Sequence, residues 1–398
     1  MAALEYWLWL SSCGLSVRAK AALLHRFGDA EQIFFAPSGA FEKLEGVTPK
    51  EAQRLEERNL RRAHEIAGAC AQQGLEMLTL QDAAYPARLR NIFSPPVVLY
   101  VKGKLPPVDS SVAIAVVGTR AASLYGRKMA RDLAYQMAKS GALILSGLTK
   151  GIDAEAAQGA LLADGSVIGV LGTPHEAEQG QLARSVAAWG ALISEYPPGT
   201  RHQNSAFRER NRITAGLSLG VLAVEAPEKS GTHLFVEEAA AQGKEIFAVP
   251  GNADAQSSAG TLLMLKEGAK LATCGWDVLG EFARVYPGSL HRTEQLHAPE
   301  APKPEPDAQA PKPKTEPPAL DKKSAKGYID LKQQLSELSE DALRVIAAME
   351  AEPAHVDDIV ERSQLPVSKV LTQLTILQVK GYVQRLPGQR YERKITKK

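Results

Sequence analysis

The middle of the chain repeats one pattern, in which a short apolar run is followed by a longer segment with apolar residues at helical spacing. Six runs have the length of strands and no polar face: Ala113–Val117, Ala142–Ser146, Val167–Leu171, Ala191–Ser194, Val221–Glu225 and Glu245–Val249. Segments between them, such as Gly126–Lys139 and Asp153–Leu162, have helical periodicity. Strands buried on both faces that alternate with helices predict an α/β fold with a doubly wound parallel sheet. A further run, Val97–Val101, predicts an additional strand at one edge.

Residues 1–75 have a helical pattern instead. Thr48 is expected to cap a helix, with Pro49 at its first position and Glu51 closing a capping box. Apolar residues then recur at helical spacing until Gly74, which predicts the helix end: Leu55, Ala63, Ile66, Ala67 and Cys70. Two helices joined by Gly-Val-Thr resemble a helix–hairpin–helix, whose amides can contact a DNA backbone. Simple packing of the helices is the interpretation that we favour.

The C-terminal part contains a proline-rich stretch and then a second ordered pattern. Eight of the 24 prolines fall between Pro299 and Pro318, a composition that favours an extended, disordered linker. Three helices follow, at Asp341–Met349, His355–Arg362 and Pro366–Lys380, and an alternating segment that turns at Pro387-Gly388 predicts a hairpin. Three helices and a hairpin indicate a winged helix. The patterns divide the chain into a helical domain (1–78), the sheet domain (79–287), a linker (288–330) and a winged helix (331–398).

Charge and cysteine usage narrow the class of protein. A net charge of +2 over 398 residues means that any site for a polyanion is a local patch. The three cysteines lie far apart without a CxxC motif, so we expect neither a disulfide framework nor a zinc site. No apolar run reaches the roughly 20 residues that span a bilayer, and the N-terminal segment lacks the basic flank of a signal peptide. These features predict a cytoplasmic protein without membrane contact.

The carboxyl ends of the predicted strands, which we call the rim, carry the candidate chemistry. Ligands of doubly wound sheets bind at this edge. Five strands are followed by small residues, where a phosphate can approach backbone amides and helix N-termini: Gly118-Thr119-Arg120, Ser146-Gly147, Leu171-Gly172-Thr173, Ser230-Gly231-Thr232 and Pro250-Gly251. One such glycine is usually only a tight turn. Their repetition predicts a phosphate-binding rim.

Three arginines are the cations that we expect at the rim: Arg120, Arg210 and Arg212. Phe207 precedes the last two, and an aromatic ring beside cations is typical of sites for single-stranded nucleic acid, because unstacked bases can lie on it. A solvated basic helix anchored in the core by Phe207 would explain this stretch equally well.

Enzyme signatures are missing from the sequence. It contains no GxGxxG after the first strand of the doubly wound pattern, no Walker A motif and no GxSxG elbow, and His175-Glu176 lacks the cysteines of a deaminase zinc site. Asp153 and Glu237 could form an acid pair, although capping and surface roles explain them as well. These absences weigh against a dinucleotide site and against ATP hydrolysis, and we expect no metal or cofactor.

Several motifs between Tyr85 and Ala272 resemble those of the DNA-processing protein DprA (Smf) family of bacterial natural transformation. They are Tyr85-Pro-Ala-Arg-Leu, Pro95-Pro-Val-Val-Leu-Tyr-Val-Lys-Gly, Val117-Gly-Thr-Arg with Tyr125-Gly126, Ser146-Gly-Leu-Thr-Lys-Gly-Ile-Asp, Ser194-Glu-Tyr-Pro-Pro-Gly, Arg210-Asn-Arg-Ile, Ser230-Gly and Ala248-Val-Pro-Gly, in the order of the family. The resemblance implies an extended Rossmann-like domain that dimerises, with a SAM-like or hairpin domain before it and a winged helix after it.

The resemblance also implies that the protein binds DNA and is not an enzyme, and it implies a set of contacts. Such proteins hold incoming single-stranded DNA, displace or bypass single-strand-binding protein and load RecA. The residues that would contact DNA are Gly118, Thr119, Arg120, Tyr125, Gly126, Ser146, Gly147, Lys150, Gly151, Phe207, Arg210, Asn211, Arg212, Ser230 and Gly231. No local motif identifies the surface for RecA or the dimer interface. Whether the winged helix binds duplex DNA is also open, because its third helix presents few basic residues.

The chain departs from the family pattern at four places. The segment after Gly172 lacks the usual Tyr-Pro and Asn, Arg208 replaces a proline, Thr-His-Leu-Phe follows Ser230-Gly231, and Leu262 replaces an asparagine. The alternative interpretation is a nucleoside-phosphate hydrolase of the lysine-decarboxylase-like group, since Ser230-Gly-Thr with Glu237 distantly resembles its glycine–glutamate motif. The Pro-Gly-Gly of that group is absent.

Overall fold

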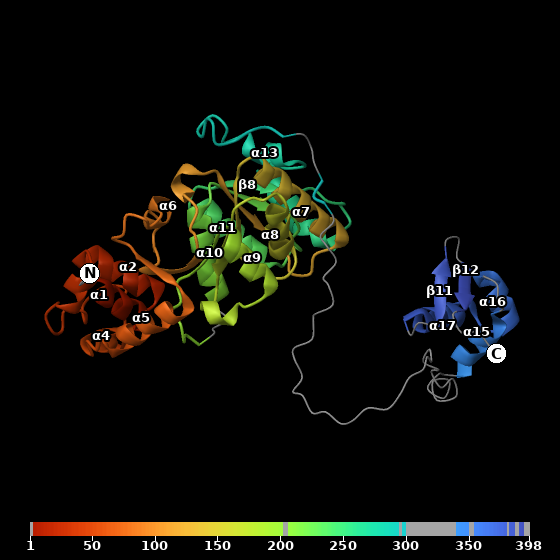
Figure 1. Cartoon of the computed structure of the whole chain (residues 1–398), viewed down its shortest axis with the longest axis horizontal. Helices are drawn as coiled ribbons and strands as arrows, with labels where there is room; N and C mark the ends of the chain where they lie inside the picture. Colours follow the sequence, from red (N-terminus) through yellow and green to blue (C-terminus); the bar gives the residue numbers. More distant parts are fainter. Residues whose placement is uncertain are drawn as a thin grey trace, which may run out of the picture. The chain divides into compact units, whose positions relative to one another are not determined.

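A computed structural model describes residues 3–201, 206–293, 297–299, 340–349, 354–379, 382–386 and 390–393 (Figure 1). The chain forms two compact units, Met1–Pro306 and Asp307–Lys398, and each is described by itself. Most of the linker predicted at 288–330 lies outside the described residues. Within these residues, no helix is both long and apolar enough to cross a membrane.

The first unit is built on a nine-stranded sheet with the order β1-β2-β6-β5-β4-β3-β7-β8-β9. Strands β3 to β9 all run parallel to one another, whereas β2 runs antiparallel to both β6 and β1. The strands are β1 (Glu76–Thr79), β2 (Val98–Gly103), β3 (Ala113–Val117), β4 (Leu143–Ser146), β5 (Val167–Leu171), β6 (Ala191–Ser194), β7 (Gly220–Ala223), β8 (Glu245–Ala248) and β9 (Lys270–Leu271). The predicted doubly wound α/β fold is confirmed.

Helices cover both faces of this sheet. Alternate residues of β3 divide between two cores: Ile114 and Val116 pack with helices on one face, and Ala113, Ala115 and Val117 pack with helices on the other. The first face carries α7 (Leu124–Lys139), α8 (Ile152–Leu162), α9 (Gln181–Trp189) and α13 (Gly275–Leu279). The second face carries α6 (Ala87–Arg90), α10 (Ala206–Leu217), α11 (Gly231–Ala241) and α12 (Ala259–Lys266).

The N-terminal part of this unit is helical, as expected. Its helices are α1 (Ala3–Ser12), α2 (Val17–Phe27), α3 (Ala30–Phe34), α4 (Pro49–Glu56) and α5 (Arg61–Gln73). The capping box at Thr48 and Glu51 is formed, and Gly74 ends α5 in the left-handed region. The helical pattern predicted from Leu55 to Gly74 is interrupted at residues 57–60, where Arg58 has a φ of 40°. Residues 35–47 are turns and contain no helix, so the hairpin that a helix–hairpin–helix requires is not formed there.

Strand β2 connects this helical part to the sheet. Val98 and Tyr100 are buried with the N-terminal helices, whereas Leu99 and Val101 are buried in a core of the sheet. The strand predicted at the edge therefore lies one position inside it, because β1 pairs with its outer side. Sequence patterning missed β1, which has only four residues and two well-buried side chains.

The second unit is a winged helix with its own core. It contains α15 (Glu340–Ala348), α16 (Val356–Ser363) and α17 (Val367–Val379), and a sheet of β10 (Ala354–His355), β12 (Arg390–Arg393) and β11 (Val383–Leu386) in that order. The predicted helices and hairpin are confirmed, and β10 is additional. The turn at residues 387–389 and the basic tail from 394 to 398 lie outside the described residues.

Candidate nucleic-acid interface

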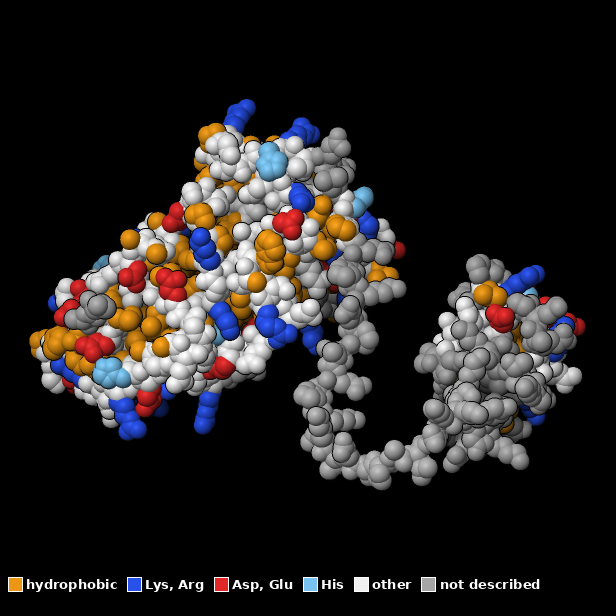
Figure 2. Space-filling model, viewed as in Figure 1, with side chains coloured by type: hydrophobic (Ala, Val, Ile, Leu, Met, Phe, Trp, Pro, Cys, Tyr) orange, Lys and Arg blue, Asp and Glu red, His pale blue; other side chains and the backbone are white. Residues whose placement is uncertain are grey.

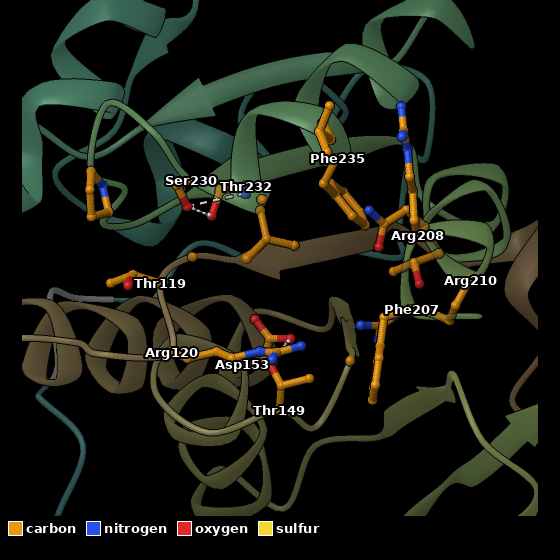
Figure 3. Close-up of a pocket in the computed structure, with 18 of the residues that line it drawn as sticks. Thr119, Arg120, Thr149, Asp153, Phe207, Arg208, Arg210, Ser230, Thr232 and Phe235 are labelled. Atoms are coloured by element: carbon orange, nitrogen blue, oxygen red, sulfur yellow. Dashed lines mark hydrogen bonds between the residues drawn. The ribbon is translucent and has the colours of Figure 1, made fainter. Parts of the chain in front are cut away.

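A cavity of about 530 Å³ opens at the rim, where loops after β3, β4 and β7 meet the first turns of α10 and α11 (Figure 3). It is lined by Val117, Gly118, Thr119, Arg120, Gly147, Thr149, Asp153, Phe207, Arg208, Arg210, Asn211, Thr214, Pro227, Lys229, Ser230, Gly231, Thr232, Leu234 and Phe235. These residues come from segments more than a hundred residues apart in the sequence. Three of the five strand ends named from the sequence therefore meet in this cavity, whereas Gly172-Thr173 and Pro250-Gly251 do not line it.

The N-terminus of α11 is the part of the cavity best suited to an anion. Ser230 caps this helix, and its Oγ accepts a hydrogen bond from the Thr232 amide at 3.2 Å. A Cβ added to Gly231 would meet no atom within 4 Å, so a ligand can approach the backbone here. The helix dipole and the neighbouring ammonium of Lys229 both favour negative charge at this point.

The N-terminus of α7 is closed to such a ligand. Glu225, which is 1% exposed, accepts a hydrogen bond from the Ser123 amide through Oε2 at 2.8 Å. A side chain at Gly126, in the first turn of α7, would collide with this carboxylate. This helix follows β3, the position that often binds the pyrophosphate of a dinucleotide in doubly wound folds. An internal carboxylate occupies that position here, which agrees with the missing GxGxxG.

Two kinds of cation line the cavity. Arg120 is exposed, and its Cζ lies 5.2 Å from the centroid of the Phe207 ring; Arg208 and Lys229 are also exposed. Arg210 is 6% exposed, and its Nη1 donates a hydrogen bond to the Val170 carbonyl at 2.8 Å. The exposed cations can reach a ligand, whereas Arg210 forms part of the floor. Figure 2 shows Lys and Arg side chains scattered among hydrophobic and acidic side chains on the visible face of the first unit.

Asp153 is the carboxylate of the cavity floor. Its Oδ2 accepts a hydrogen bond from Thr149 Oγ1 at 2.9 Å. Burial raises the pKa of Asp153, although the nearby Arg210 guanidinium acts in the opposite direction. Burial likewise lowers the pKa of Arg210, and Asp153 opposes that change. Glu237 is exposed on α11 and does not line the cavity, so the acid pair considered from the sequence is not formed within it.

The cavity brings together nine of the fifteen residues predicted from the sequence: Gly118, Thr119, Arg120, Gly147, Phe207, Arg210, Asn211, Ser230 and Gly231. The Arg210 guanidinium packs directly against Gly147, and a Cβ at this position would collide with it.

The other six predicted residues do not line the cavity. Tyr125 Oη donates to the Pro250 carbonyl at 2.7 Å, and Ser146 is buried with its Oγ donating to the Asp153 carbonyl at 2.8 Å. Gly126 faces Glu225, and Gly151 lies against the Thr119 and Arg120 carbonyls at the start of α8. Lys150, just before it, is exposed.

Arg212 was expected to lie at the rim, but the structure places it elsewhere. Its guanidinium forms a buried ion pair with Glu195, with Nη2 2.7 Å from Oε2, and does not line the cavity. Sequence reasoning also left Arg208 and Lys229 out of the site. Lys229 could have been found, because it immediately precedes the Ser230-Gly231 turn.

Two family models match the chain. One is described as DNA recombination-mediator protein A and matches residues 76–283, and the other is the DprA winged helix domain and matches residues 330–389. The first covers more than half of the chain. The chain belongs to the DprA family. The resemblance predicted from its motifs is thereby confirmed, and the role of this DprA-family protein is that of a DNA recombination mediator.

Individual relatives agree with this assignment. The Smf protein of Synechocystis is 32% identical over 409 residues, which cover 98% of each chain. The DNA processing protein DprA of Bacillus subtilis is 36% identical over 220 residues, covering 54% of this chain and 74% of the relative. The X-ray structure of DprA from Streptococcus pneumoniae is similar with a TM-score of 0.57 and 30% identity, over 70% of this chain and 97% of that one. The similarity to this structure supports the fold of the chain, and the winged helix is supported by the family match at residues 330–389.

Proposed function

We propose that this protein binds single-stranded DNA along the rim and loads RecA onto the bound strand during natural transformation. The observation that carries the proposal is the rim cavity, where exposed cations, an open helix N-terminus and an aromatic ring lie together. Phosphates would lie against Arg120, Lys229 and the start of α11. A base would stack on Phe207, which requires a base that is not already stacked in a duplex.

The remaining parts of the proposal follow from membership of the family. They are protection of incoming DNA, displacement of single-strand-binding protein, transfer of the strand to RecA, and action as a homodimer in the cytoplasm. The proposal also keeps the domain boundaries predicted from the sequence: a helical domain (1–78), the sheet domain (79–287), a linker (288–330) and a winged helix (331–398). In this proposal the protein binds and transfers DNA without a cofactor and without chemical change to it.

The hydrolase alternative has less support. The only carboxylate lining the cavity is Asp153 among the residues described, and Thr149 and Arg210 already surround it. Glu237, which would complete the motif of that group, lies outside the cavity. Release of free base from nucleoside monophosphates by the purified protein would restore this alternative.

The Arg120→Ala variant tests the proposal directly. Fluorescence anisotropy with labelled single strands should show binding weakened by about tenfold for every sequence, because phosphate contacts carry no sequence information. The slope of log affinity against log salt should fall by about 0.7, the value for one phosphate contact on a single strand. The control is Arg284→Ala, an exposed arginine that does not line the cavity. Affinity and slope equal to those of the control would contradict the proposed site.

Loading of RecA requires a separate measurement. Single strands coated with single-strand-binding protein would be mixed with RecA, and its DNA-dependent ATPase followed after addition of the protein. We expect a shorter lag with the natural protein and with Arg284→Ala, and no shortening with Arg120→Ala. A lag that the natural protein does not change would refute RecA loading and leave DNA binding untouched.

A further inference from the structure

A second cavity, of about 590 Å³, lies between the N-terminal helices and the sheet of the first unit. One wall is the start of α2, and the other consists of the segments after β5 and β6. Four cationic side chains line it: Arg18, Lys20, Arg62 and Arg201. This concentration contrasts with the nearly neutral charge of the whole chain.

The acidic residues of this second cavity already have partners. Glu195 is neutralised by Arg212 in the buried ion pair, and Glu209 accepts a hydrogen bond from Tyr196 Oη at 3.1 Å. The Lys20 ammonium, in contrast, has no hydrogen bond or ion pair with another residue that the structure describes. Burial also lowers the pKa of Lys20 against the opposing effect of Glu195. An anion in the cavity would supply the hydrogen-bond acceptor that Lys20 lacks among the described residues.

The first turn of α10 separates the two cavities. At the start of α10, Phe207 and Arg210 line the rim cavity, whereas Ala206 and Glu209 line the second cavity. Gly172, which also lines the second cavity, lies directly against Phe207, and a Cβ added to it would come within 2.9 Å of the ring. The stacking position on Phe207 is therefore adjacent to the second cavity.

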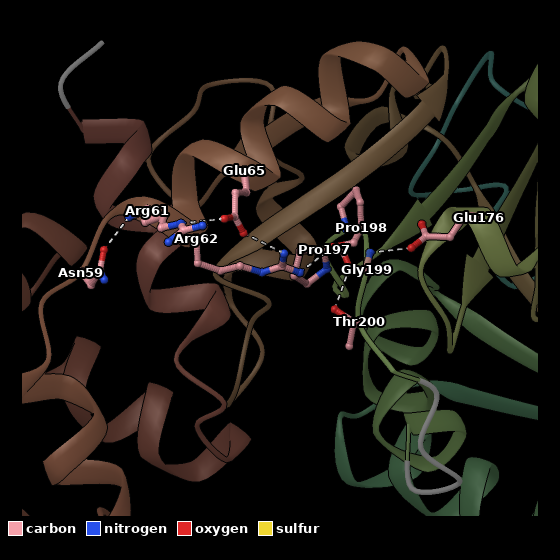
Figure 4. A network of polar contacts seen from close by, with 9 residues as sticks. All are labelled: Asn59, Arg61, Arg62, Glu65, Glu176, Pro197, Pro198, Gly199 and Thr200. Atoms are coloured by element: carbon pink, nitrogen blue, oxygen red, sulfur yellow. Dashed lines mark hydrogen bonds and ion pairs between the residues drawn. The ribbon is translucent and has the colours of Figure 1, made fainter.

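The far wall is held in place by polar contacts between the helical part and the sheet (Figure 4). Arg62 on α5 donates from Nη2 to the Pro198 carbonyl at 3.0 Å and lies 3.3 Å from Glu65 Oε2. The Gly199 amide in turn donates to Glu176 Oε1 at 2.5 Å. Arg62 is thus a structural clamp. Arg18 lies 3.8 Å from Glu45 in an ion pair, so Lys20 and Arg201 remain as the cavity cations without an ion pair among the described residues.

We infer that the N-terminal helical domain extends the DNA-binding surface, with Lys20 and Arg201 receiving the sugar-phosphate backbone of the same single strand after it passes Phe207. This inference rests on the proposed function, because it continues the path of the strand from the rim. It assigns to the helical domain a role in binding phosphodiester groups through the second cavity rather than through a helix–hairpin–helix.

The double variant Lys20→Gln/Arg201→Gln tests this path with strands of graded length. Short strands that fill only the rim should bind as they do to the natural protein. Longer strands should bind roughly tenfold more weakly, and their salt slope should fall by about 1.4, since two phosphate contacts are lost. The matched control is Lys43→Gln/Lys50→Gln, which removes two exposed charges of the same domain outside the cavity.

The outcomes separate this inference from the proposed function. If the double variant binds strands of every length as tightly as its control does, while Arg120→Ala still weakens binding, the inferred extension is wrong. The proposed binding site at the rim is then unaffected. A loss that is equal for short and long strands would also overturn it, because the second cavity would then belong to the first contact. If Arg120→Ala has no effect, the proposed function itself fails.

Amine labelling of the natural protein provides a readout that needs no variant. Lys20 should be protected from an acylating reagent by a long strand, and should stay reactive with a short strand or with inorganic phosphate. Protection by inorganic phosphate alone would show a site for a free anion and would overturn the inference. Lys50, which is exposed outside the cavity, should label equally in all samples.

Discussion

The carboxylate of Glu51 connects two helices of the N-terminal domain. It accepts hydrogen bonds from the Ser16 amide at 2.7 Å and from the Thr48 amide at 2.9 Å, so it binds the starts of both α2 and α4. Burial alone would raise its pKa, but these hydrogen bonds outweigh that effect and lower the pKa to about 2. The charged form is therefore the one that stabilises the folded domain.

Glu51→Gln should destabilise the N-terminal domain by about 2 kcal/mol at neutral pH, because an amide accepts more weakly than a carboxylate. A depressed pKa stabilises the fold fully above the unfolded value near 4.5, and this contribution disappears as the pH falls towards about 2. The difference from the natural protein should therefore shrink over that range. Hydrogen exchange of the α2 and α4 amides would measure it. Glu42→Gln, at an exposed residue, should show no difference at any pH.

Residue-scale features were predictable where their partners are near in the sequence. The capping box follows from Thr48, Pro49 and Glu51, but the hydrogen bond from Ser16 spans 35 residues and has no local signal. The rim shows the same division. Arg120 lies three residues after the end of β3 and lines the rim cavity, whereas the position of Arg212 depends on Glu195 from another strand end.

At the scale of the elements, the start of α7 depends on the absence of a side chain at Gly126. Gly126→Ala should destabilise the first unit by about 2 kcal/mol, since the methyl group and the Glu225 carboxylate would compete for the same space. Chemical denaturation would measure the effect. The control is Gly68→Ala in α5, where a Cβ meets nothing within 4 Å, and it should stabilise the helix by about 1 kcal/mol. Equal effects of the two substitutions would contradict the steric account.

Element prediction succeeded where burial is continuous. Strands β3, β5 and β6 have the predicted boundaries, and every residue in them is buried. Strands β4 and β7 are equally buried, and their observed ends lie within two residues of the predicted ones. Strands β9 and β10 have two residues each, too few for any periodicity, and exist because neighbouring strands pair with them. The helical pattern across residues 57–60 gave no signal for the break, since Leu60 continues the apolar spacing.

At the scale of the whole molecule, the two units have separate cores. The core of the winged helix contains residues only from 342 to 391, and its Leu374 is fully buried. Leu374→Ala should therefore lower the stability of the winged helix by about 3 kcal/mol, and should leave the melting of the first unit and its affinity for single strands unchanged. Calorimetry would show two transitions, of which one moves.

The control for this experiment is Leu371→Ala on the same helix, where the side chain is 42% exposed and should matter much less. A shift of both transitions in the Leu374 variant would show that the units are energetically coupled. The separation into units was predictable from the proline-rich composition. The antiparallel pairing of β2 with β6, in contrast, joins residues 88 to 94 positions apart and could not be predicted from local patterning.

The shared strand β2 has a mechanical consequence. Since its alternate side chains belong to two cores and its backbone pairs with β6, the helical domain cannot swing about a hinge without shearing a row of peptide hydrogen bonds. A captured polymer that is pulled from one end would load those bonds together rather than one after another. A pulling force on the helical domain would then be transmitted directly to the rim. In the proposed binding mode, the polymer would stay bound until the sheet itself unfolded.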